Sequence, residues 1–209
     1  MFLFLLALEH MARSECFLYG ISMALAASLF FFSGFFWIDA EYGVTGGTLL
    51  NLGASCWIPA FIGLFTLVKP KLPVYATWGL PFAILGCLAG ANFALVGVNT
   101  EIFHLSHRAY LDGYSQYPLS ANLLLFWTGP LFPLSLLLLS VQLIRTRTLD
   151  SRAAILLGLG SIAFPISRIG RDPWVTHVAD LLLVLAMAYY ASHFIRKGMR
   201  AQKKFLENR

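Results

Sequence analysis

Long apolar windows separated by short polar stretches dominate the chain. Residues 17–38, 42–68, 72–100 and 113–144 carry no charged side chain, and the apolar stretches 153–170 and 174–195 are interrupted only by Arg168 and Asp180. A helix needs about 20 mostly apolar residues to cross a bilayer core of about 30 Å. The pattern therefore predicts six membrane-spanning helices, at about 17–38, 47–68, 74–97, 120–144, 153–170 and 174–195.

The same windows favour helices over the strands of a membrane β-barrel. Backbone groups in hydrocarbon must be hydrogen-bonded within the protein, which leaves only helices or a closed barrel. Barrel strands are short and alternate polar with apolar residues, whereas these windows are long and continuously apolar. The predicted fold is an all-α, polytopic membrane protein, with residues 1–209 forming one six-helix domain.

The placement of the basic residues predicts the orientation of these helices. Twelve of the 15 Lys and Arg residues fall near the two chain ends and in the segments 69–73 and 145–152, and the other three are Arg108, Arg168 and Arg171. Positive residues concentrate in cytoplasmic loops. We therefore expect both termini to be cytoplasmic in a multi-pass inner (plasma) membrane protein, with residues 196–209 as a polybasic tail on anionic membrane lipids.

Composition supports this environment and narrows the function. The chain is 58% apolar and only 12% charged, against about 25% charged in an ordinary soluble domain. Its net charge of +5 is explained by orientation, so no nucleic-acid partner is expected. No glycine-rich phosphate loop and no Gly-x-Ser-x-Gly turn is present, which argues against ATP hydrolysis and serine hydrolysis by this chain.

Ionisable residues at membrane depth indicate functional positions because they are expensive to bury in lipid. His177 and Asp180 lie three residues apart and share one face of the last predicted span. Arg168 and Arg171 stand just before it, and we expect Arg168 to extend to the headgroups. Two guanidinium groups can hold a phosphate or carboxylate. The leading hypothesis is an outward-facing pocket formed by these four residues, with residues 100–118 as its lid, that binds or transports a lipid, an amphiphile or a small solute.

Two other hypotheses remain open. His104 and His107, together with His177 and Asp180, have the chemistry of ligands for a divalent metal such as Zn²⁺, with Glu101 as general base; this set would make the protein a metal-dependent lipid hydrolase. Alternatively, the protein is a structural subunit of a membrane complex. In that case His177 and Asp180 bond to each other, or to Arg168 or Arg171, and tie the last two spans together.

Overall fold

The computed structural model describes residues 13–37 and 41–207, apart from the side chains of His107 and of residues 203–207. Every long element in this part of the chain is a helix. Their bounds are α2 Arg13–Ser33, η1 Gly34–Phe36, α3 Gly43–Val68, α4 Pro73–Ile102, α5 His107–Ser115, α6 Pro118–Ala121, the π-helix η2 Asn122–Phe126, α7 Leu131–Thr146, α8 Ser151–Gly170 and α9 Pro173–Glu207.

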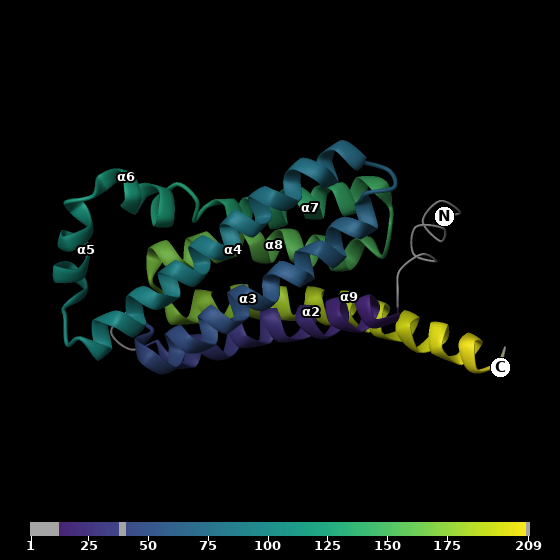
Figure 1. Ribbon diagram of the computed structural model, residues 1–209, viewed down its shortest axis with the longest axis horizontal. Coiled ribbons are helices and arrows are strands. Elements are labelled where there is room, and N and C mark those ends of the chain that lie inside the picture. Colours follow the sequence, from purple (N-terminus) through teal and green to yellow (C-terminus); the bar gives the residue numbers. More distant parts are fainter. Residues whose placement is uncertain (1–12, 38–40, 208–209) are drawn as a thin grey trace.

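Six segments are long and apolar enough to cross a membrane, as predicted. They are Arg13–Phe36, Gly43–Val68, Pro73–Ile102, Pro118–Thr146, Ser151–Gly170 and Pro173–Gln202. Helices adjacent in this series pack side by side, and α9 also packs along α2, which closes a ring (Figure 1). Because successive helices alternate in direction, α2 begins and α9 ends at the same end of the bundle. We call the opposite end, where α5 lies, the α5 end.

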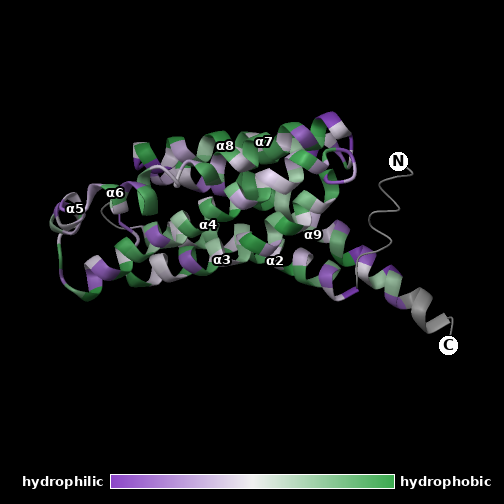
Figure 2. Ribbon diagram, turned by 45° about the horizontal axis from the view of Figure 1, so that its top comes forward, coloured by the Kyte–Doolittle hydropathy of each residue, from purple (hydrophilic) through white to green (hydrophobic). Residues whose placement is uncertain are grey.

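Aromatic side chains from four helices fill the interior of the ring. The ring centroid of Phe30 lies 6.1 Å from that of Trp57 and 5.6 Å from that of Phe132. Phe30 also stacks on Phe164, with the centroids 5.9 Å apart. Many of the exposed side chains of the long helices are apolar too, and hydrophobic residues recur along the whole length of these helices in Figure 2. A helix that is apolar on all sides is typical of a membrane span.

Glycines set how closely some of these helices approach. A Cβ atom on Gly86 of α4 would lie 2.4 Å from the backbone nitrogen of Phe132 in α7. On Gly47 of α3 it would lie 2.6 Å from the carbonyl oxygen of Ala94 in α4. No real Cβ atom tolerates such distances, so α4 packs against both neighbours with its backbone nearly in contact. Small residues commonly have this role between membrane helices.

The chain between α4 and α7 departs from the expected simple loop and regular span. The segment 100–118 contains α5, which lies crosswise to the long helices at their end (Figure 1). The fourth apolar segment then continues through α6, the π-helix and a turn before α7 begins. The Asn92 side chain donates a hydrogen bond to the carbonyl of Leu124 in the π-helix, at 3.1 Å. The irregular backbone of this apolar segment is thereby partly satisfied by a neighbouring helix.

Residues 196–207 of the expected polybasic tail are part of the last helix. α9 has 35 residues, a length of about 52 Å at about 1.5 Å per residue, and its C-terminal part extends beyond the other helices (Figure 1). Arg196, Lys197 and Arg200 are in the C-terminal third of this helix. The basic residues are therefore carried on a continuous helix.

Candidate functional site

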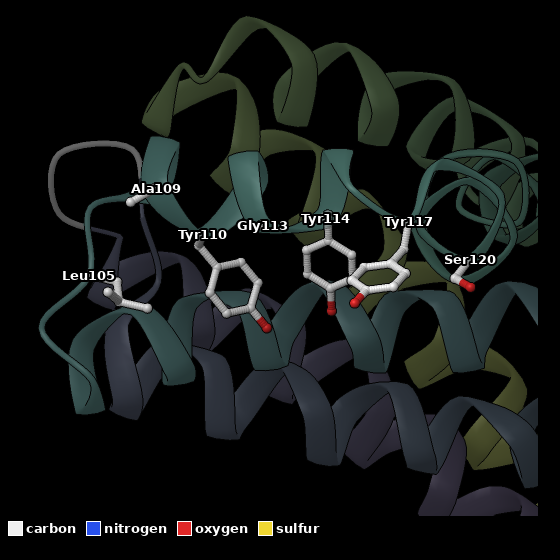
Figure 3. Close-up of a pocket in the computed structure, with 7 residues that line it drawn as sticks. All are labelled: Leu105, Ala109, Tyr110, Gly113, Tyr114, Tyr117 and Ser120. Atoms are coloured by element: carbon white, nitrogen blue, oxygen red, sulfur yellow. The ribbon is translucent and has the colours of Figure 1, made fainter.

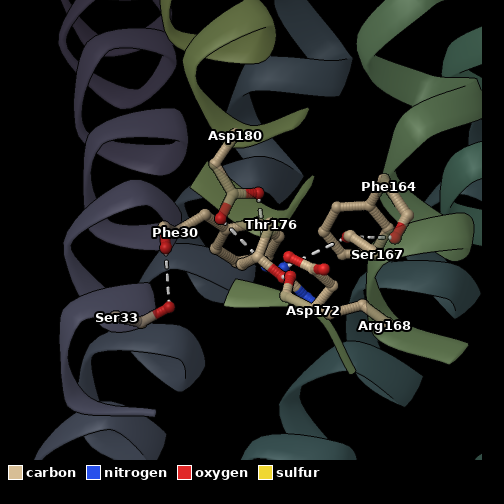
Figure 4. A network of polar contacts seen from close by, with 8 residues as sticks. All are labelled: Phe30, Ser33, Phe164, Ser167, Arg168, Asp172, Thr176 and Asp180. Carbon is tan, nitrogen blue, oxygen red and sulfur yellow. Dashed lines mark hydrogen bonds and ion pairs between the residues drawn. The ribbon is translucent and has the colours of Figure 1, made fainter. Parts of the chain in front are cut away.

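Arg168 of α8 and Asp180 of α9 form a buried ion pair at the α5 end (Figure 4). The Nη2 atom of Arg168 donates hydrogen bonds to both carboxylate oxygens of Asp180, at 3.2 and 3.0 Å. The side chain of Asp180 is fully buried and that of Arg168 is only 17% exposed. The expectation that Arg168 extends to the headgroups is therefore wrong, because a buried carboxylate holds it inside the bundle. The alternative pairing of Asp180 with Arg168 is confirmed.

Three aromatic rings surround the same guanidinium group. Its Cζ atom lies 4.7 Å from the ring centroid of Phe164, and 5.8 Å from those of Trp37 and Tyr42. Trp37 and Tyr42 stack on each other with centroids 5.4 Å apart. We define the Arg168 cluster as Arg168, Asp180 and the three aromatic residues Trp37, Tyr42 and Phe164. Its positive charge is compensated by Asp180 and by cation–π contacts inside the protein.

Burial also changes the acidity of Tyr42, which immediately precedes α3. Burial raises the pKa of Tyr42 to about 12, although the adjacent Arg168 opposes the shift. The Tyr42 hydroxyl and the Trp37 Nε1 atom have no hydrogen-bond partner within the described part of the chain. The cluster is thus rich in aromatic contacts and poor in satisfied hydrogen bonds.

His177 and Arg171, the other two predicted pocket residues, have different settings. The His177 ring packs on Phe35, with centroids 4.4 Å apart, and its buried Nδ1 atom has no hydrogen-bond partner in the described structure. Arg171 is exposed, at the left-handed C-cap of α8. Asp172, the next residue, accepts hydrogen bonds from the backbone of Trp174 and Val175 and so begins α9. Of the four predicted pocket residues, only Arg168 and Asp180 bond to each other.

Glu101, the predicted general base, contacts the start of another helix. Its carboxylate accepts a hydrogen bond from the backbone nitrogen of Val44, in the first turn of α3. Gly43 has a φ of 58°, and a Cβ atom there would collide with the Glu101 carboxylate. A carboxylate at this position satisfies a free N–H group and complements the helix dipole. The observed contact gives Glu101 a structural role.

The described residues do not assemble the predicted metal site. His104 is exposed in the turn after α4, with a φ of 53°. No group of three His, Cys, Asp or Glu side chains that could hold a metal ion occurs among the described side chains. His104 is therefore not brought together with His177 and Asp180. The side chain of His107, the remaining predicted ligand, is outside the described part of the chain.

A cavity at the α5 end lies away from the Arg168 cluster, between α5 and the neighbouring chain. It has a volume of about 460 Å³ and is lined by Leu105, Ala109, Tyr110, Gly113, Tyr114, Tyr117 and Ser120 (Figure 3). We call it the tyrosine groove. None of its lining residues carries a charge. Figure 3 shows the three tyrosine rings in a row, with their hydroxyl groups on the side away from α5.

Hydrogen bonds hold the tyrosines in place. The Asn99 side chain of α4 donates to the Tyr110 hydroxyl at 3.0 Å, which joins α5 to the long helix beneath it. A hydrogen bond to Tyr110, assisted by burial, raises the pKa of Tyr114. Ser106 begins α5 by accepting a hydrogen bond from the backbone of Ala109. Hydrogen bonds thus fix the start of α5 and the tyrosine hydroxyls that line the groove.

The sequence reasoning missed this groove, although a signal was present. Among the described side chains of α5, Tyr110, Leu111 and Tyr114 are half-buried, whereas Arg108 and Asp112 are exposed. Side chains four residues apart share a helix face. The pattern of residues 107–115 is therefore typical of a short amphipathic helix.

Comparison of the chain with protein-family models, with curated proteins and with solved structures finds no match.

Proposed function

We propose that the protein is a multi-pass membrane protein that binds an amphiphile in the tyrosine groove. Six helices long and apolar enough to cross a bilayer support the membrane assignment. The groove supports the binding role: its volume of about 460 Å³ falls within the usual range of small-molecule sites, about 300 to 1,000 Å³. Its residues also match the general pattern of apolar walls with a few polar groups.

The lining chemistry indicates which part of an amphiphile is held. Leu105, Ala109 and the tyrosine rings offer apolar surface to a hydrocarbon chain. The hydroxyls of Tyr114, Tyr117 and Ser120 offer hydrogen bonds to an ester or an alcohol. Because no lining residue is charged, any ionic headgroup lies outside the groove. The proposed ligand portion is the acyl chain and ester region of a glycerolipid.

The Arg168 cluster is a weaker candidate for ligand binding. Its arginine bonds to a fully buried carboxylate and is covered by three rings. An incoming anion would have to displace Asp180, which would leave that carboxylate buried and unpaired at a large cost. The ion pair supports a role in joining α8 to α9.

The proposed orientation places both termini in the cytoplasm and the tyrosine groove at the outer face of the inner membrane. Arg196, Lys197 and Arg200 in the C-terminal part of α9 support this orientation by the positive-inside rule. Alkaline phosphatase fused after Arg209 should be inactive in a bacterial host, and the same enzyme inserted after Gln116 should be active. The reverse result would overturn the orientation.

A binding measurement with a one-chain lipid tests the amphiphile site. The full chain, purified in a maltoside detergent, is titrated with monooleoylglycerol and complexes are counted by native mass spectrometry. Gly113→Trp should weaken binding about tenfold or more by filling the groove. A Cβ atom on Gly113 meets nothing within 4 Å, so the indole enters open space.

Gly170→Trp is the matched control. Gly170 is also exposed in a helix, and its added Cβ atom likewise meets nothing within 4 Å, but it does not line the groove. The Gly170→Trp variant should bind monooleoylglycerol as tightly as the wild type does. Absence of monooleoylglycerol and dioleoylglycerol binding to the wild type, or equal loss in both tryptophan variants, would reject the proposed function.

A further inference from the structure

A second cavity adjoins the tyrosine groove. It has a volume of about 200 Å³ and is lined by Leu111, Tyr114, Ser115, Pro118, Ala121, Asn122 and Phe126. Its lining also carries no charge. Tyr114 is the one residue that lines both cavities. The smaller cavity therefore lies next to the groove with this tyrosine between them.

The geometry of α5 explains why Tyr114 has this position. Residues 110, 113 and 114 form one stripe at i, i+3 and i+4 spacing, and they line the groove. Residues 111, 114 and 115 form the neighbouring stripe with the same spacing, and they line the smaller cavity. Adjacent stripes of a helix diverge around its surface. The two cavities accordingly extend to different sides of the Tyr114 side chain.

The π-helix builds the far wall of the smaller cavity. Asn122 and Phe126, its first and last residues, both line that cavity. A π-helix is wider than an α-helix, and such bulges often occur at functional sites. The hydroxyl of Thr128 donates to the carbonyl of Leu123 at 2.8 Å, which satisfies part of the irregular backbone. The cavity is thus made by a specific backbone irregularity that neighbouring side chains support.

We infer that the site takes a two-chain glycerolipid whose acyl chains lie on either side of Tyr114, one in the tyrosine groove and one in the smaller cavity. This inference rests on the proposed function and adds the class of ligand. Tyr114 lines both cavities and so lies nearest the point where the two chains join. Its proton is directed to Tyr110, so its hydroxyl oxygen is left to accept a hydrogen bond from a hydroxyl group of the glycerol.

Charge and location favour a lipid over a peptide or a polar solute as occupant. Both cavities are lined by uncharged, mostly apolar residues and lie at one end of a bundle of membrane-spanning length. Tyrosine is enriched at this depth, where lipid esters meet water. A two-chain lipid fills both cavities at once, whereas a one-chain lipid leaves one of them without a ligand.

The test compares dioleoylglycerol with monooleoylglycerol on the full chain in the same detergent. The two-chain lipid should bind the wild type about tenfold more tightly, because its second chain is also removed from water. Ser115→Trp fills the smaller cavity from its exposed edge. It should reduce dioleoylglycerol affinity to the one-chain level and leave monooleoylglycerol affinity unchanged.

Gln116→Trp controls for an added indole at this position. Gln116 is exposed, follows Ser115 directly and lines neither cavity, so both affinities should stay at wild-type values. The inference is overturned if both lipids bind equally, or if Ser115→Trp and Gln116→Trp have the same effect. In either case monooleoylglycerol binding that is lost in Gly113→Trp still supports the proposed function, so the two failures are distinguishable.

Discussion

The α5 end contains two aromatic regions with opposite properties, the Arg168 cluster and the tyrosine groove. In the cluster, aromatic rings cover an ion pair whose carboxylate is fully buried. In the groove, aromatic rings face a cavity, and Tyr117 remains 67% exposed. The charged residues of α8 and α9 thus form a closed contact between helices, whereas uncharged tyrosines on and just after the short helix α5 line an open surface. The charged residues that stand out in the sequence are therefore less accessible than the uncharged tyrosines.

The largest expected effect comes from breaking the ion pair on one side. Asp180→Ala should destabilise the protein by about 3 to 5 kcal/mol, because Arg168 is left buried without its partner. The measurement is unfolding by sodium dodecyl sulfate of the protein in mixed micelles, followed by circular dichroism. Lipid binding in the tyrosine groove should persist below the unfolding transition.

A double substitution separates loss of the pair from loss of packing. Arg168→Met with Asp180→Leu replaces both charges by apolar side chains and should recover much of the stability lost in Asp180→Ala. A double variant as unstable as the single variant would show that the charges themselves stabilise the bundle. An unchanged single variant would contradict the closed character of the cluster.

The next effect compares one glycine near each region. A Cβ atom on Gly34 would lie 3.1 Å from the Cε1 atom of His177, whereas one on Gly113 meets nothing within 4 Å. Gly34→Leu should destabilise by about 1 to 3 kcal/mol through overpacking. Gly113→Leu should be neutral or should stabilise α5 by up to about 1 kcal/mol, because leucine is the better helix former.

Thermal unfolding of the two leucine variants in one detergent provides the comparison. Gly34→Leu should lower the midpoint, and Gly113→Leu should leave it unchanged or raise it. Equal losses in both variants would remove the distinction between a filled and an open region.

A smaller effect isolates one aromatic contact of the cluster. Phe164→Leu removes the ring nearest to the Arg168 guanidinium, 4.7 Å from its Cζ atom, and should cost about 1 kcal/mol in cation–π energy in addition to lost core packing. In the Arg168→Met/Asp180→Leu background the cation–π part should vanish. A double-mutant cycle by the same unfolding method measures the difference.

The span pattern was predictable because a charged side chain is costly in hydrocarbon. Four uncharged windows and two apolar stretches with one charge each therefore mark the six long apolar helices. The contacts of Arg168 and Glu101 were not predictable in the same way. Arg168 meets Asp180 only through the register of α8 against α9, and Glu101 meets Val44 across 57 residues of sequence. The π-helix has no periodic signal of its own. Sequence patterns thus located the helices, whereas tertiary packing determined which polar side chains meet.

The smallest effect concerns the acidity of one tyrosine in each region. The pKa of Tyr42 is raised to about 12 by burial, and that of Tyr114 is raised mainly by the hydrogen bond to Tyr110. Tyr110→Phe should therefore lower the pKa of Tyr114 and leave that of Tyr42 unchanged. Each variant is titrated with base and followed by ultraviolet absorbance. Subtracting the Tyr114→Phe titration isolates Tyr114, and subtracting the Tyr42→Phe titration isolates Tyr42.

The sign of the accompanying stability change follows from the direction of the shift. A raised pKa means that the folded protein favours the protonated phenol, so the stabilisation is complete below the ordinary value of 10. It is lost as the pH rises through the raised pKa of Tyr114. Tyr110→Phe removes the hydrogen bond and should therefore reduce the loss of folding stability at alkaline pH. The reduction should be a fraction of the roughly 1 kcal/mol that an ordinary hydrogen bond contributes. An equal shift in Tyr42 would mean that the cluster and the groove are coupled through α4 and α3, and that the two regions do not act independently.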